Sequence, residues 1–238
     1  ECNVNLLNPR QAFCVGNVLD LDWKAGRWRV AATLWRPTKP EALLGPGGEG
    51  MVMEAVEVAG RRLLFASCTG PYLCIAELHD DYARPLMAMG SVISVFLRDG
   101  APPPEVVLAK LWDDPEQLEW AKEKYPALFT GIGQHLHRDF HELVQESVRR
   151  GKPARSQFLW TDGNGDGLVQ NDELKLFTPE EANGVVLGGG WRFAYSPDLT
   201  LYPVASVGRQ TKAWRLPLRG WNQCGAPLYD FADARFIY

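Results

Sequence analysis

The chain has 238 residues, of which 46% are hydrophobic and 23% charged, and its 25 basic and 29 acidic residues give a net charge of −4. This composition excludes an intrinsically disordered chain, and an acidic chain without a Lys/Arg block is a poor candidate for binding nucleic acid. No apolar run approaches the ~18–20 residues that cross a bilayer. The first residue is Glu and no signal peptide is visible, so we expect that a leader was removed or that the chain is a piece of a longer one.

Short strands joined by turns are expected in the first hundred residues. Two strands are predicted within 17–36, with a turn at 24–26, and the Gly/Pro-rich stretch 37–50 is predicted to be an irregular loop. Residues 51–97 contain apolar and β-branched runs separated by tight turns, which predicts one antiparallel meander. Its four strands are expected at 52–58, 61–67, 72–78 and 85–95.

The pattern changes to helices after a run of prolines at 102–104. Asp114 followed by a proline is a typical helix start, and helical spacing runs over 115–125 and 134–149. In the second helix Leu136, Phe140, Leu143 and Ser147 share one face. The sequence therefore predicts a helical insertion over 115–150.

The last third of the chain returns to strands, which are predicted at 156–160, 173–177, 191–195, 199–205, 213–218 and 228–231. Segments 51–97 and 185–232 share the same layout of four strands and their turns. A recurring four-stranded unit of 40–45 residues is typical of a β-propeller, and a β-sandwich is the main alternative. We predict a mainly β fold, a propeller or part of one, that forms a single domain over 1–238. Without the insertion about 200 residues remain, enough for about five blades at most.

One motif predicts a specific chemistry. Residues 162–173 match the pattern D-x-[DN]-x-[DN]-G-x5-E of a calcium loop without a mismatch. Gly167 at loop position 6 permits the sharp bend, and hard oxygen ligands favour Ca²⁺. The predicted ligands, at positions 1, 3, 5, 7, 9 and 12, are Asp162, Asn164, Asp166, the Leu168 carbonyl, Gln170 and Glu173.

The calcium loop is predicted to be structural. It is a single loop, and the segment before it, 157–160, has a strand-like apolar pattern in place of an amphipathic helix. Calcium sensors usually carry paired loops between helices. We therefore expect Ca²⁺ to neutralise crowded acids and to fix a long hairpin.

The stretch from Phe158 to Gly167, with the Gln and Glu that follow it, resembles calcium loops embedded in bacterial secreted β-propellers of the NHL-like type. The tail 213–221, followed by 225–231, is similar to their closing blade. The resemblance covers about 75 residues, 157–231, and the helical insertion departs from it. It implies an extracellular or periplasmic propeller, often part of a larger chain, and it carries over no catalytic residue.

Five cysteines are present, and none forms a C-x-x-C pair, so a zinc ribbon or thioredoxin-type centre has no support. Cys68 and Cys74 flank a predicted turn, where they could form a disulfide or be two small buried side chains. Because five is odd, at least one thiol is expected to be free or to pair with another chain.

Two further patterns leave alternatives open. His137 and His141 share a helix face and could hold a metal with Glu142, although a polar flank of the apolar stripe is the preferred interpretation. The nine Trp could line a sugar-binding surface or fill a core. Core positions are expected for Trp28, Trp35 and Trp214, and contact positions for Trp160, Trp191 and Trp221.

These patterns and the resemblance together predict an extracellular, calcium-stabilised interaction or scaffold module with a protein or carbohydrate ligand. One alternative is an enzyme, acting for example on carbohydrate in the propeller funnel. Another is a subunit of an extracellular assembly that uses the unpaired cysteine.

Overall fold

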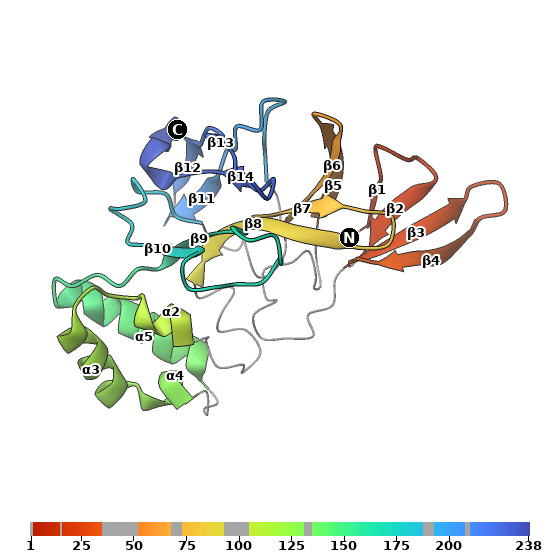
Figure 1. Cartoon of the computed structure of the whole chain (residues 1–238). Helices are drawn as coiled ribbons and strands as arrows, with labels where there is room; N and C mark the ends of the chain where they lie inside the picture. The colour runs from red at the N-terminus through yellow and green to blue at the C-terminus, as the bar shows by residue number, and fades with distance from the viewer. Residues whose placement is uncertain are drawn as a thin grey trace.

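The fold is known from a computed structural model (Figure 1). It describes residues 2–14, 16–34, 52–67, 73–92, 105–130, 135–187, 193–207 and 210–238.

A six-stranded antiparallel sheet lies at the centre, with strand order β10-β9-β8-β7-β6-β5. Its strands are β5 (Val52–Val58), β6 (Arg61–Ser67), β7 (Leu73–Leu78), β8 (Ala83–Ser91), β9 (Gln157–Thr161) and β10 (Leu174–Phe177). The turn between β5 and β6 is Ala59-Gly60, and both residues have positive φ. A two-residue type I′ hairpin turn requires this conformation, and its twist matches the twist of the two strands that it joins. The predicted four-strand meander is confirmed as β5–β8. It continues into β9 and β10, so the sheet is larger than a four-stranded blade.

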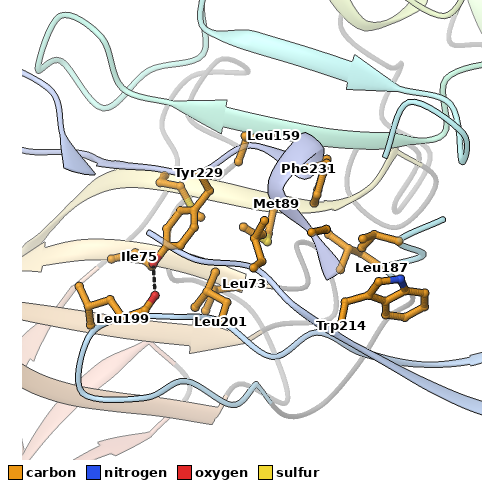
Figure 2. Close-up of a cluster of buried hydrophobic side chains, with 14 of the residues drawn as sticks. Leu73, Ile75, Met89, Leu159, Leu187, Leu199, Leu201, Trp214, Tyr229 and Phe231 are labelled. Atoms are coloured by element: carbon orange, nitrogen blue, oxygen red, sulfur yellow. Dashed lines mark hydrogen bonds between the residues drawn. The ribbon is translucent and has the colours of Figure 1, made fainter. Parts of the chain in front are cut away.

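Both faces of this sheet are buried, which explains why β6 and β7 carry unbroken apolar runs where half-exposed strands would alternate. Ala66, Cys74 and Ala88 lie on one face, beneath the N-terminal sheet and the helices. Phe65 and Ile75 lie on the other, beneath the C-terminal segments. Figure 2 shows this second core cluster, in which Tyr229 donates a hydrogen bond to the Leu199 carbonyl at 2.7 Å.

The N-terminal part forms its own four-stranded antiparallel sheet. Its strands are β1 (Cys2–Val4), β2 (Gln11–Cys14), β3 (Asn17–Asp22) and β4 (Arg27–Thr33). The two strands predicted in 17–36 are confirmed as β3 and β4, whereas β1 and β2 were not predicted. A disulfide joins Cys2 to Cys14 across the β1–β2 pair. Phe13, Val18 and Ala32 pack on the central sheet.

The helices lie between β8 and β9 in the sequence and cover the β8–β10 part of the central sheet. They are α2 (Glu105–Ala109), α3 (Pro115–Lys124), α4 (Pro126–Thr130) and α5 (Leu136–Arg149). The predicted helical insertion over 115–150 is confirmed as α3–α5, and α2 extends it toward the N-terminus. The Asp114 cap is also confirmed, since its carboxylate accepts a hydrogen bond from the Glu116 amide at 3.0 Å. The predicted face of α5 is buried at all four positions.

The C-terminal third is less regular than predicted. It forms a three-stranded sheet of β11 (Val204–Val207), β12 (Gln210–Arg215) and β15 (Arg235–Phe236), and a two-stranded sheet of β13 (Gly220–Trp221) and β14 (Pro227–Leu228). The strand predicted at 191–195 lies partly outside the described residues, and Tyr195 forms an isolated bridge with Leu201.

The mainly β class is confirmed, whereas the propeller is not. In the described part of the chain no sheet closes into a ring or a barrel, and 185–232 does not repeat the four-stranded layout of 51–97. The physical reason is that β8 pairs with β9 across the insertion, so strands that were assigned to separate units belong to one sheet. Among the described helices, none is long and apolar enough to cross a membrane.

Candidate metal centre

The predicted calcium loop connects two paired strands. Trp160 on β9 lies opposite Leu174 on β10, so residues 162–173 form the end of a hairpin, as predicted. Gly167 has a φ of +68°, and a Cβ built there would lie 3.2 Å from Pro85 Cδ. The predicted bend at loop position 6 is therefore present, and only glycine fits it without strain.

The side chains at loop positions 1, 3 and 5 each turn back onto the loop. Asp162 Oδ1 accepts the Gly165 amide at 2.7 Å, Asn164 Oδ1 accepts the Asp166 amide at 2.9 Å, and Asp166 Oδ1 accepts the Leu168 amide at 2.8 Å. Such bonds hold a side chain in one rotamer and leave each oxygen a second lone pair. Three of the predicted ligands are thus pre-oriented by their own backbone.

Gln170, at position 9, provides the clearest observation in favour of a cation. Its amide nitrogen donates to Asp166 Oδ2 at 2.7 Å, while its amide oxygen is buried and has no hydrogen-bond partner. A buried polar atom without a partner costs free energy. A Ca²⁺ ion bound at this loop position would give the oxygen a partner.

Glu173, at position 12, is folded against the start of the loop. Oε1 accepts the Gly163 amide at 2.6 Å, and Oε2 accepts the indole N–H of Trp160 at 3.1 Å. The carboxylate of Glu173 therefore lies beside the start of the loop. A residue at position 12 must be there to bind a cation together with the position-1 side chain. In the described residues no three His, Cys, Asp or Glu side chains converge as a metal cluster. Three of the six predicted ligands are amide or carbonyl oxygens, which fits an all-oxygen Ca²⁺ site.

The position-1 carboxylate is part of a charged network behind the loop. Asp162 is fully buried, and its Oδ2 lies 3.2 Å from an Arg84 guanidinium nitrogen. Arg84 also contacts Glu77 at 2.8 Å, and Glu77 contacts Arg61 at 3.0 Å. Burial raises the pKa of Glu77, but hydrogen bonds and charge from Arg84 and Arg61 outweigh this effect and hold the pKa below its usual range.

The loop also contacts segments distant in sequence. Asn222, in the turn between β13 and β14, donates to the Asp162 carbonyl at 2.7 Å, and the Cys224 thiol donates to the Gly163 carbonyl at 3.1 Å. The Asp162 amide donates to the Leu86 carbonyl on β8 at 2.8 Å. Lys110, just after α2, donates to the Leu174 carbonyl at 2.6 Å. The loop therefore lies where the central sheet, the helical region and the C-terminal hairpin meet.

No local pattern in the sequence could have identified these contacts. Arg84 and Asn222 lie about 80 and 60 residues from the loop, and they reach it because β8 is the neighbour of β9 and because the C-terminal segments fold over the sheet. The predicted ligands of the loop, in contrast, all lie within residues 162–173 and were visible as a motif.

The weaker site predictions have mixed outcomes. His141 is exposed and bonds Gln145 on its own helix at 2.9 Å, which fits the polar-flank interpretation, and the side chain of His137 is outside the described residues. Whether Cys68 and Cys74 form a disulfide or are two separate small side chains stays open, because residue 68 is also outside the described residues. The disulfide of the described chain is Cys2–Cys14, and Cys224 is a half-buried free thiol.

The predicted roles of the tryptophans are partly wrong. Trp214 is buried as predicted, but Trp28 was expected in the core and is 66% exposed. Trp160 was expected at a contact surface and is fully buried, because its strand lies beneath the helices. Trp221 is part-exposed and lies under the Arg61 guanidinium, whereas Trp35 and Trp191 lie outside the described residues.

A second feature is the outer face of the N-terminal sheet. Across β3 and β4, Leu19 lies opposite Val30 and Leu21 opposite Trp28, and this row faces away from the core. With Trp23 these side chains line a shallow depression that contains no charged residue. Trp23 and Trp28 are each 66% exposed. Exposed apolar side chains that lie side by side are a feature of interaction sites.

Comparisons with protein-family models, with curated proteins and with solved structures find no match for this chain.

Proposed function

We propose that this chain is a calcium-stabilised interaction module, in which one Ca²⁺ ion at residues 162–173 fastens three parts of the fold together. The observation that carries the proposal is the buried Gln170 oxygen without a partner, in a loop whose position-1, -3 and -5 side chains are already oriented by the backbone. The role is structural, because the loop is one hairpin end packed on other segments.

An extracellular or periplasmic location belongs to the same proposal. The Cys2–Cys14 disulfide supports it, because disulfides persist mainly in oxidising compartments, where Ca²⁺ is also abundant enough for structural sites of modest affinity. The propeller ring implied by the NHL-like resemblance stays a prediction.

The test is a Ca²⁺ titration of chelator-treated protein, followed by calorimetry and by thermal unfolding. We expect one Ca²⁺ per chain and a higher Tm with Ca²⁺, since a ligand that binds only the folded state stabilises it. Glu173→Gln should abolish most of the effect. Glu180→Gln, on an exposed glutamate outside the loop, is the matched control. An unchanged Tm of the unmodified protein in Ca²⁺ would contradict the proposal.

For the ligand of the module, the uncharged outer face of the N-terminal sheet favours carbohydrate. Exposed Trp23 and Trp28 present aromatic rings on an open surface, and such rings offer large apolar faces with a polar edge. The experiment is binding to insoluble neutral polysaccharides, with Trp28→Ala as the variant and Trp221→Ala as the control. If the protein instead elutes as an oligomer that Trp28→Ala dissociates, the face is an assembly contact, which is the alternative of an extracellular assembly subunit.

A further inference from the structure

Asp162 is the most deeply buried charged group of the candidate metal centre, with no exposed side-chain surface. A carboxylate in this position needs a compensating charge, because removing an ion from water is costly. Arg84 provides that charge without any metal, at 3.2 Å from Oδ2. The loop thus has a built-in cation at its position-1 ligand.

The Arg84 guanidinium is held firmly in this place. One terminal nitrogen donates to Asp162 and to the Gly165 carbonyl, and the other donates to Glu77 and to the Cys224 carbonyl. Arg84 therefore links β7, the loop and the C-terminal hairpin, which are segments that Ca²⁺ is proposed to fasten. Arginine supplies a positive charge without any metal, so this link is present in the metal-free protein.

A Ca²⁺ ion at the same loop would meet this charge. Oδ1 of Asp162 already accepts the Gly165 amide, and Oδ2 accepts from Arg84. The ion must share Oδ1 with the Gly165 amide, or it must share Oδ2 with the guanidinium or displace the guanidinium from it. In the second case Arg84 remains within a few ångströms, because Glu77 holds it at 2.8 Å. Like charges at this separation and low exposure repel strongly.

We infer that Arg84 is an internal counter-ion that sets the calcium response of this protein: it holds the loop in place without metal and lowers the affinity of the loop for Ca²⁺. The inference rests on the proposed calcium site and adds its regulation. The same side chain makes the fold tolerant of calcium loss and restricts binding to high Ca²⁺ concentrations.

The experiment measures Ca²⁺ affinity and the Ca²⁺-induced Tm shift for the full chain and four variants. Arg84→Gln removes the charge and should tighten Ca²⁺ binding by about tenfold or more, while lowering the Tm without metal and enlarging the Tm shift. Arg84→Lys retains a positive charge, and its affinity should stay within about threefold of the unmodified protein. Glu77→Gln exposes the loop to the full charge of Arg84 and should weaken Ca²⁺ binding.

The matched control is Arg61→Gln. Arg61 belongs to the same network and bonds Glu77 and the Gly225 carbonyl, but no bond joins it to residues 162–173 among the contacts described. Its removal should change Ca²⁺ affinity less than Arg84→Gln does. If Arg84→Gln folds only in the presence of Ca²⁺, the counter-ion role is supported directly.

The outcomes separate the two proposals. If the unmodified protein binds Ca²⁺ and Arg84→Gln binds it equally or more weakly, Arg84 orients the ligand and the counter-ion inference is wrong. If neither the unmodified protein nor any variant binds Ca²⁺, the calcium site itself is wrong, and the inference fails with it.

Discussion

The N-terminal sheet and the helical region cover the same face of the central sheet, but their outer surfaces differ. In α5 the residues that face away from the core are mostly polar or charged, for example Glu142 and Gln145, so this surface is compatible with exposure to water. In β4 the corresponding side chains include Trp28 and Val30, which are exposed. The outer surface of the helical region is polar and is solvated by water. The outer surface of the N-terminal sheet is apolar, and a partner can bury it.

The largest expected effect concerns the helical cover. Phe140 is fully buried between α5 and the sheet, so Phe140→Ala should lower the free energy of unfolding by about 3–5 kcal/mol. Urea unfolding followed by circular dichroism measures this change. Val148→Ala, at an exposed position of the same helix, is the control. A loss below ~1 kcal/mol for Phe140→Ala would mean that the helices contribute little to the core.

A smaller effect concerns the ion pairs that anchor the helical region. Arg155 contacts Asp113, which precedes α3, and bonds Glu181 at 2.9 Å. The hydrogen bond from Arg155 is the main cause that lowers the pKa of Glu181. Because the folded-state pKa lies below the unfolded value of ~4.3, this stabilisation is present above that pH and is lost as pH falls through the lowered value.

Glu181→Gln should therefore cost up to ~1 kcal/mol at pH 7, since the pair is partly exposed and screened. The difference between Glu181→Gln and the unmodified protein should shrink by pH 3. Urea unfolding at the two pH values measures it, with Glu180→Gln as the control. A difference that stays constant over this range would show that Glu181 acts through packing.

The smallest stability effect is expected on the outer face of the N-terminal sheet. Trp28→Ala should change the free energy of unfolding by no more than about 0.5 kcal/mol, because the ring has little of its surface in the core. It should nevertheless reduce the binding of an apolar fluorescent dye. A strong loss of stability would show that Trp28 supports the sheet, and the contrast with the helical cover would disappear.

Sequence alone predicted the parts of the molecule whose signals are local. The bend at Gly167, the Asp114 cap and the buried stripe of α5 each depend on residues a few positions apart, whereas calcium binding by the loop stays a prediction. Trp28 and Trp160 were assigned wrongly because the environment of a strand face depends on which layer covers it. The pairing of β8 with β9 joins segments separated by the whole insertion, and no periodicity within either strand indicates the neighbour.

The pairing of β8 with β9 has a consequence for the order of folding. Ser91 and Gln157 are register partners, so this ladder forms only after the intervening segment has closed into a loop, which slows it relative to local hairpins. The β5–β8 meander needs no such closure. We expect it to form early, with β9, β10 and their hairpin end docking later. The predicted calcium ligands all lie within residues 162–173, but Arg84 reaches this loop only after that late step.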